Sequence, residues 1–288
     1  MPKYTPFKDP KNMKIKNNSI DFSTSTPMIM GILNISSDSF YDGGKYSDEN
    51  KIILQTQKML DEGADVIDVG GQSSKPGAKQ IDAKKELSIV LPVIKLLKSR
   101  FPDIIISIDT FWSEVAKECV EEGADIINDI SAGEIDKNMF NVVRELQVPY
   151  IMMHMQGKPE NMQNKPQYKD IIKEIKYFFE RKISELRHKG FSKIIIDPGL
   201  GFGKSITHNY KLINNITSFK ELELPVLIGA SRKSLIYNVL ETEARYALNG
   251  TTIINTLALI NGANILRVHD VKEAMECIKI IKFAKNNL

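Results

Sequence analysis

Short apolar runs alternate with longer segments of helical period along most of this 288-residue chain. The runs are rich in β-branched residues, and in the segments between them apolar residues recur about every 3.6 positions. Eight such runs are present, at residues 28–33, 66–69, 104–108, 126–127, 150–153, 194–196, 226–228 and 265–268. This alternation predicts β-α units with parallel strands, and so limits the fold to a closed barrel or an open sheet covered by helices.

The number of units and the character of the strands favour the closed barrel. Strands that are apolar on both faces suit a (β/α)8 barrel, in which a ring of helices covers the strands from outside. Three predicted helices end in similar Gly-containing turns, at residues 62–65, 122–125 and 261–264. We therefore predict a single (β/α)8 barrel over residues 28–288, with an open doubly wound sheet as the alternative. Residues 1–27 are polar and rich in Pro, Ser and Thr, which predicts an irregular or capping arm.

Composition narrows the possible partners and compartment. Charged residues make up 26% of the chain and the formal net charge is +3, without a long basic run, so nucleic acid is not expected as a partner. No segment has the roughly 18 uncharged apolar residues of a membrane helix, and the start lacks the apolar core of a secretory signal. Cys119 and Cys277 lie in helical segments, where we expect them to fill core positions. We expect a cytoplasmic protein that does not bind membranes.

Polar residues follow nearly every predicted strand. They are Asn34, Asp68, Asp109, Asn128 with Asp129, His154, Asp197, residues 231–233, and Arg267 with His269. In a barrel these strand ends meet at one mouth, where active sites lie. Polar loops and helix caps explain part of this pattern. However, Asp109, Asn128 and Asp197 each end an apolar run, so each should be partly buried and should need a partner, such as a ligand rich in N–H donors.

Some polar residues have a structural explanation instead. Asp270 precedes a helical segment and Glu273 follows three positions later, which is a capping-box pattern. His188 and His208 lie near predicted helix ends, where structural or capping roles are expected. These residues are therefore set apart from the candidate site.

The last strand indicates an anion site. Arg267 and His269 are two residues apart, so their side chains point the same way and could hold one anion together. Asn34 ends the first strand, which neighbours the last strand in a closed barrel. A dianionic group that bridges these two strands with Mg²⁺ is therefore a reasonable prediction.

Eight motifs, taken together and in order, resemble the dihydropteroate synthase family. They read MGILNISSDSF from residue 30, DVGGQSSKPG from 68, IDT from 108, INDIS from 127, HMQG from 154, DPGLGFGK from 197, GASRKS from 229 and RVHD from 267. Each motif alone is weak, but eight in the family's order are specific and span most of the chain. The resemblance implies a folate-synthesis transferase that joins a pterin carbinol, activated as its diphosphate, to p-aminobenzoate.

The resemblance also assigns roles to residues. The pterin would contact Asp109, Asn128, Met153, Asp197, Lys233 and Arg267. The diphosphate would be held by Asn34, Arg267 and His269, with Mg²⁺ as the cofactor and Asn34 as its ligand. The p-aminobenzoate would contact Ser73, Ser74, Lys75, Pro76, Phe202 and Ser234. The catalytic residues would be Asp38, Lys233, Arg267 and His269.

The family's chemistry and assembly are further expectations. The diphosphate would depart first and leave a pterin-methyl cation for the arylamine to attack, without a covalent enzyme intermediate. Catalysis would then consist of charge stabilisation and positioning. Members of the family form homodimers and are targets of sulfonamides, so we expect both properties here.

The chain departs from the family pattern in the two substrate loops. Gln72, Ser74 and Lys75 replace the usual Glu, Thr and Arg, and Ser36–Ser37 replaces Thr-Pro. Lysine lacks the two-pronged geometry of arginine, so our hypothesis is an altered affinity for p-aminobenzoate or sulfonamides with pterin binding intact. Two alternatives remain open: a methyltetrahydrofolate-type methyltransferase barrel, and a paralogue that binds pterin without turnover.

Overall fold

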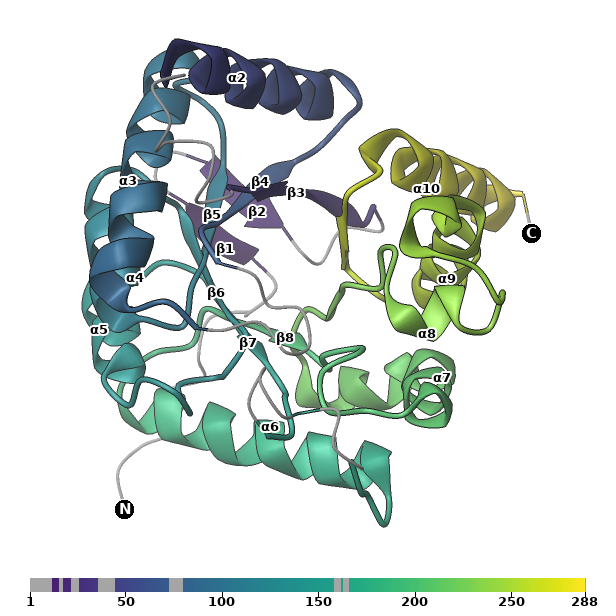
Figure 1. The fold of residues 1–288 in the computed structure, drawn as a ribbon. Coiled ribbons are helices and arrows are strands. Elements are labelled where there is room, and N and C mark those ends of the chain that lie inside the picture. Colours follow the sequence, from purple (N-terminus) through teal and green to yellow (C-terminus); the bar gives the residue numbers. More distant parts are fainter. Residues whose placement is uncertain are drawn as a thin grey trace.

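The eight apolar runs form eight parallel strands that surround a common axis (Figure 1). The computed structural model describes residues 12–15, 18–21, 26–35, 45–72, 80–157, 162 and 166–287. The barrel strands are β3 (Met28–Asn34), β4 (Val66–Gly70), β5 (Ile106–Asp109), β6 (Ile126–Asp129), β7 (Tyr150–Met153), β8 (Ile194–Asp197), β9 (Leu227–Ile228) and β10 (Ile265–Val268).

Hydrogen bonds connect the strands in the order β8-β7-β6-β5-β4-β3-β10-β9. The remaining gap, between β8 and β9, is closed by a parallel bridge from Ile196 to Val226 and by a bond from Ile196 N to Pro225 O at 3.0 Å. The sheet is therefore a barrel, as predicted, and the open-sheet alternative is wrong.

Helices form a ring outside the strands (Figure 1). They are α2 (Lys45–Asp61), α3 (Ala83–Arg100), α4 (Ser113–Glu121), α5 (Met139–Leu146), α6 (Ile171–His188), α7 (Ile206–Asn214), α8 (Ser234–Tyr237), α9 (Leu248–Ile260) and α10 (Val271–Asn286), with 3-10 turns η1 (Ile216–Leu222) and η2 (Ala244–Tyr246). None of the helices in the described part of the chain is long and apolar enough to cross a membrane.

The predicted structural roles of several residues are confirmed. Gly63, Gly123 and Gly262 have φ angles of 101°, 121° and 99°, as the repeated helix-ending turns require. Cys119 and Cys277 are buried, free thiols.

The two helix-end histidines also have the expected roles. His208 forms a capping box with Ser205 at the start of α7. At the end of α6, His188 Nδ1 lies 2.7 Å from Ser184 O.

The inward-facing side chains form two layers, because alternate residues of a strand point to the same side. The lower layer is an apolar cluster of Met30, Val66, Ile126, Ile151, Ile195, Leu227 and Ile265. Two positions further along five of these strands come Asp68, Asn128, Met153, Asp197 and Arg267. Strand periodicity therefore places the polar site directly above an apolar floor.

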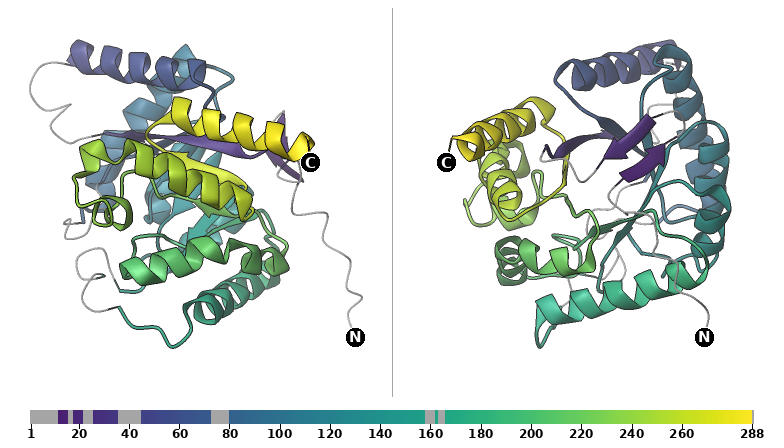
Figure 2. Two further views of the ribbon diagram at one scale, coloured as in Figure 1. Left: turned by 90° about the vertical axis from the view of Figure 1, so that its right-hand side faces the viewer. Right: turned by 180° about the vertical axis from the view of Figure 1, so that it is seen from behind.

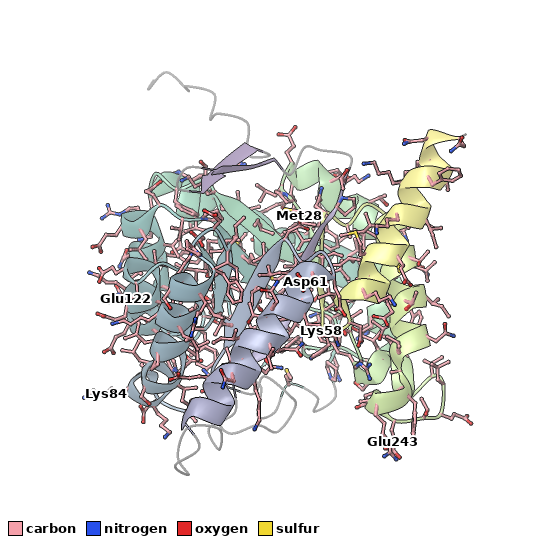
Figure 3. The ribbon with its side chains drawn as sticks, turned by 90° about the horizontal axis from the view of Figure 1, so that it is seen from above. Met28, Lys58, Asp61, Lys84, Glu122 and Glu243 are labelled. Carbon is pink, nitrogen blue, oxygen red and sulfur yellow. The ribbon has the colours of Figure 1, made fainter. Side chains whose placement is uncertain are left out.

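Part of the N-terminal arm forms a β-hairpin that was not predicted from the sequence. Strands β1 (Asn12–Ile15) and β2 (Asn18–Asp21) pair antiparallel, with Met13 opposite Ile20. The hairpin lies over the barrel when the molecule is seen from behind (Figure 2). It lies on the side of Met28, at the start of β3, whereas Lys84 and Glu243 lie at the other end (Figure 3). The hairpin is therefore at the barrel end opposite the polar layer.

The turn after β8 is pressed against the turn after β7. Gly199 has a φ of 72°, and a Cβ there would lie 2.0 Å from the carbonyl oxygen of His154. Gly203 has a φ of 63°, and a Cβ there would lie 2.3 Å from the carbonyl oxygen of Gln156. Only glycine suits both the left-handed backbone and this close approach.

Gly199→Ala is expected to lower the free energy of unfolding by more than Gly190→Ala. Gly190 also has a positive φ, 82°, but a Cβ there meets no atom within 4 Å, so alanine should cost only about 1 kcal/mol of backbone strain. At Gly199 the clash adds to the strain, for a total of about 3 kcal/mol. Urea denaturation measures both losses, and equal losses would contradict the close packing of the two turns.

Candidate active site

Arg267 is held between two aspartates inside the barrel mouth. Its Nε donates to Asp68 Oδ2 and its Nη2 donates to Asp109 Oδ2, each at 2.6 Å. Asp68 is fully buried and also accepts a bond from Asn128 Nδ2 at 3.2 Å. The network therefore joins four strands, β10, β4, β5 and β6, at their carboxyl ends. Asp68 was recognised in the sequence as a polar residue at a strand end, but no binding or catalytic role was predicted for it.

Burial and neighbouring charges together set the protonation of this network. Burial raises the pKa of Asp109, Arg267 opposes the rise, and the charge of Asp68 adds to it. Burial alone would lower the pKa of Arg267, but Asp68 and Asp109 outweigh it and raise that pKa. Arg267 is thus a fixed cation, and Asp109 is a carboxylate that a ligand with N–H donors would stabilise in its charged form.

Lys233 and Asp197 lie together on the other side of the mouth. Burial raises the pKa of Asp197, and the charge of Lys233 opposes this. Burial lowers the pKa of Lys233 to about 8, and Asp197 opposes that shift in turn. Lys233 Nζ donates to Leu200 O at 2.7 Å and lies 4.6 Å from the centre of the Phe202 ring. The structure thus places Lys233, a predicted pterin residue, against Phe202, a predicted p-aminobenzoate residue.

An apolar wall borders the polar residues. Met153 is buried and packs in one cluster with Phe111, Ile130, Met162 and Phe202. Met153 and Phe202, both predicted site residues, therefore line the same side. A wall of this kind suits the face of a flat ring, while the carboxylates suit its polar edge.

The predicted anion residues differ in their electrostatic character. Burial, together with the charge of Arg267, lowers the pKa of His269 to about 4, so the imidazole is neutral near pH 7. Its Nδ1 lies 3.0 Å from Ser231 Oγ. Asn34 is exposed at the end of β3, where its Oδ1 would lie 3.6 Å from a Cβ on Gly70. Arg267 is therefore the cation of this group, whereas His269 and Asn34 offer neutral polar contacts.

The capping-box prediction for Asp270 is wrong. Asp270 precedes α10, but its side chain makes no capping bond. Its carboxylate instead accepts bonds from Arg232 Nε at 2.9 Å and Nη2 at 2.8 Å. A two-pronged bond to a charged partner outweighs a single bond to a backbone N–H. The Arg232–Asp270 ion pair holds the loop that carries Lys233 to the start of α10. The predicted site residue Ser234 follows this loop and is half-buried at the start of α8.

Another buried lysine was not among the predicted site residues. Lys204 is 2% exposed, and its Nζ donates to the carbonyl oxygens of Phe202 at 2.8 Å and His154 at 3.1 Å. Burial lowers its pKa well below the usual range. Lys204 therefore joins the turns after β7 and β8. A lysine in a loop is ordinarily exposed, so its place at the end of the DPGLGFGK motif did not predict that it would be buried.

Five predicted site residues lie outside the described residues, so their roles stay predictions. They are Asp38, Ser73, Ser74, Lys75 and Pro76.

The fold and the site define a class of protein. They describe a (β/α)8-barrel enzyme whose mouth presents acceptor side chains to a flat, nitrogen-rich ring and cations to an anion. The sequence profile of the pterin binding enzyme family matches residues 30–269. The dihydropteroate synthase of Escherichia coli strain K12 is 38% identical over 272 residues, which cover 94% of this chain and 96% of that protein. The chain belongs to the dihydropteroate synthase family of pterin-binding enzymes.

Solved structures give the same relationship. A Yersinia pestis dihydropteroate synthase in a sulfonamide drug complex superposes with a TM-score of 0.88 and 36% identity, covering 96% of this chain and 99% of that one. A Xanthomonas albilineans dihydropteroate synthase with 4-aminobenzoic acid superposes with a TM-score of 0.86 and 33% identity, covering 96% and 98%. The predicted family is thereby confirmed.

Asp68→Asn is expected to destabilise the protein by about 3 kcal/mol, because a buried ion pair loses one charge. Asp270→Asn is the control, since Asp270 is also the aspartate of an Asp–Arg ion pair, but the Arg232 and Asp270 side chains are 28% and 16% exposed. For Asp270→Asn we expect the free energy of unfolding to fall by about 1 kcal/mol. Urea denaturation compares the two, and a smaller loss for Asp68→Asn would contradict its role as the main anchor of Arg267.

Proposed function

We propose that this chain joins (7,8-dihydropterin-6-yl)methyl diphosphate to p-aminobenzoate, releasing diphosphate and forming 7,8-dihydropteroate. It is then a transferase of folate synthesis, like the synthases to which it is similar. The observation that carries the proposal is the ring of acceptors Asp109, Asn128 and Asp197 around Lys233 and Arg267. The relatives named above are synthases, which favours this activity over the methyltransferase alternative.

The proposed pterin orientation follows from the donors and acceptors of the site. The aminopyrimidine edge carries N–H groups, which suit the buried carboxylates of Asp109 and Asp197 and the amide of Asn128. Lys233 supplies donors to the ring acceptors. The apolar side chain of Met153 covers the ring face. The flat guanidinium of Arg267 can lie along the ring and still reach a phosphate.

Bond breaking is proposed to come first. The C–O bond to the diphosphate breaks and its electron pair leaves with the diphosphate, whose growing charge Arg267 stabilises. The arylamine nitrogen then forms the C–N bond and gives up a proton. Phe202 and Ser234 border the side from which the amine would approach Lys233.

Magnesium is proposed as the cofactor, with Asn34 as its protein ligand. The described residues contain no group of three or more His, Cys, Asp or Glu that could hold a metal by themselves. That fits Mg²⁺, which commonly binds through substrate phosphates and few protein oxygens. It would neutralise charge on the diphosphate, while His269 and Arg267 hold the same group.

A homodimer and a cytoplasmic location complete the proposal. Large apolar side chains are exposed on α9 and α10, which supports an interface there; they are Ile253, Ile260, Ile280 and Phe283. The two free cysteines suit a reducing compartment. Sulfonamides are proposed as inhibitors, which the sulfonamide drug complex of the Yersinia pestis synthase supports.

Purified protein with Mg²⁺ and the pterin diphosphate is expected to release diphosphate only when p-aminobenzoate is added, with dihydropteroate found by chromatography. Lys233→Met should lower kcat/KM by about 100-fold, because a preorganised cation is lost. Lys189→Met, at an exposed helix end, is the control. Tight pterin binding without product from the wild type would instead favour the non-catalytic paralogue.

Pterin affinity is expected to fall as the pH drops below about 7. Burial raises the pKa of Asp109 to about 7, so at lower pH the free enzyme holds a proton that must leave before the carboxylate can accept N–H donors. Well below this pKa, the Kd of a hydroxymethylpterin should rise about tenfold per pH unit. Asp109→Asn should bind more weakly but with a flatter profile. Titration calorimetry between about pH 5.5 and 7.5 measures the Kd of both proteins. If the Kd of the wild type and that of Asp109→Asn changed equally with pH, the role of Asp109 would be contradicted.

A further inference from the structure

Two loops at the barrel mouth are joined by side chains that are neighbours in sequence on both sides. Ser231 Oγ lies 3.0 Å from His269 Nδ1, and in the next position Arg232 forms its two-bond ion pair with Asp270. The first loop follows β9 and the second follows β10, which is the strand beside it. Consecutive residues of one loop therefore hold consecutive residues of the other.

The backbone of the first loop is held in an unusual conformation. Arg232 has a φ of 55°, in the left-handed region that residues with a side chain rarely adopt. Its backbone N–H donates to Thr251 Oγ1 at 3.0 Å, so α9 holds the same residue from another side. Strained residues persist where the surrounding structure fixes them, often at functional sites. The place of Ser231 is therefore set by its neighbour in the chain, independently of its own contact with His269.

The hydroxyl of Ser231 contacts His269 twice. Its Oγ accepts a bond from the His269 backbone N–H at 3.2 Å and lies 3.0 Å from the ring nitrogen Nδ1. Ser231 is 4% exposed, and the described residues give its Oγ no further hydrogen-bond partner. Because Oγ already accepts from the backbone, its own hydrogen needs an acceptor, and Nδ1 is the one in reach.

These two contacts decide which nitrogen of a neutral ring carries the proton. If Nδ1 carried it, Nδ1 would donate to Ser231 Oγ, and the buried hydroxyl hydrogen would have no acceptor among the described residues. An unpaired buried donor is unfavourable, so the form with the proton on Nε2 should be preferred by at least about fivefold. In that form Nδ1 accepts from Ser231, and the Nε2–H of His269 can donate to a ligand.

The surroundings of His269 favour the neutral ring. Burial is the largest effect that lowers its pKa, and the charge of Arg267 follows it. Arg232 and Lys233 lower the pKa further, whereas Asp270 opposes them. Arg267 and His269 are two residues apart at the end of β10, so their side chains face the same side. His269 is therefore suited to help Arg267 bind an anion by a hydrogen bond, not by a second positive charge.

We propose that Ser231 is a positioning residue that holds His269 as a neutral N–H donor to the diphosphate. Ser231 accepts the backbone N–H and donates to Nδ1, which fixes the direction of the ring and keeps the proton on Nε2. Arg267 supplies the positive charge, and His269 supplies a directed bond. This inference rests on the proposed function, because that function supplies diphosphate as the ligand. Ser231 itself touches neither substrate in the proposal.

Nitrogen-15 NMR of protein labelled at histidine measures the tautomer directly. The chain has four histidines, and the signal that is absent from His269→Gln belongs to His269. The wild type at about pH 7 should show a protonated Nε2 and an unprotonated Nδ1, both with and without inorganic diphosphate. Ser231→Ala should show a mixture of the two tautomers. A charged ring in the diphosphate complex, or an unchanged tautomer in Ser231→Ala, would overturn the proposal.

Calorimetry measures the consequence for anion binding. Inorganic diphosphate is titrated into protein that holds Mg²⁺ and a hydroxymethylpterin. Ser231→Ala should raise the Kd of diphosphate by about fivefold, as expected when one hydrogen bond is weakened. The Kd of the hydroxymethylpterin alone should change by less than about twofold, because the Arg232–Asp270 pair still holds the loop that carries Lys233. Equal losses for the two ligands would mean a general loosening of the mouth and would contradict the proposal.

Thr251→Val is the matched control for Ser231→Ala. Thr251 is 2% exposed, and its hydroxyl holds the same loop through Arg232 N, but its other bond goes to Ala247 O instead of His269. Each variant loses one buried hydroxyl, so thermal unfolding should show comparable losses of stability. Only Ser231→Ala should change the tautomer and the Kd of diphosphate. The same changes in Thr251→Val would show that Ser231 acts only by stabilising the loop.

Substitutions of His269 test whether Nε2 is the donor. The amide nitrogen of a glutamine can reach the place of Nε2, whereas that of an asparagine reaches only the place of Nδ1. Both amides are uncharged. His269→Gln should therefore bind inorganic diphosphate about fivefold more tightly than His269→Asn. Equal affinities in the two variants would contradict the role of the Nε2–H.

These measurements separate the inference from the proposed function, because neither spectroscopy nor binding requires turnover. A wild type that has the expected tautomer and binds diphosphate but makes no product counts against the proposed function alone. Turnover by the wild type, with an unchanged tautomer and an unchanged diphosphate Kd in Ser231→Ala, overturns the inference alone. A wild type that binds no diphosphate overturns both.

Discussion

A single guanidinium buried between two carboxylates organises the mouth of this barrel. Arg267 reaches from β10 past β3 to Asp68 on β4 and Asp109 on β5, and a buried ion pair of this kind is strongly destabilised when one partner is removed. The side chain also fixes the protonation of its neighbours, because it favours the charged form of Asp109 and the neutral form of His269. Stability and chemistry therefore depend on the same residue.

The sequence was sufficient to predict the barrel because its strongest signals are local. A β-branched run of four or five residues and a segment of helical period can each be recognised without tertiary information. The β1–β2 hairpin was missed, since its short strands contain Asn, Ser and Lys and only Met13, Ile15 and Ile20 alternate with them. Pairing between such short segments is decided by the tertiary structure.

The active site was predictable only in part, because one sequence shows local signals but not contacts between distant residues. Strand-end position and motif order identified Asp109, Asn128, Asp197 and Lys233, and the structure brings these residues to one mouth. Pairings between distant residues were invisible in one sequence. Nothing local distinguishes Asp68 as the partner of Arg267, Asp270 as the partner of Arg232, or Ser231 as the partner of His269. Each required the distances that only the folded chain provides.

The backbone contact between the turns after β7 and β8 has an evolutionary consequence. Gly199 and Gly203 leave no room for a side chain, and Lys204 joins the same two turns from inside. Few single-residue changes in these two turns would preserve the fold. An inhibitor seated against the pterin side of the mouth would therefore face a surface with little scope for escape mutations, whereas contacts made by surface side chains can be altered without unfolding the protein.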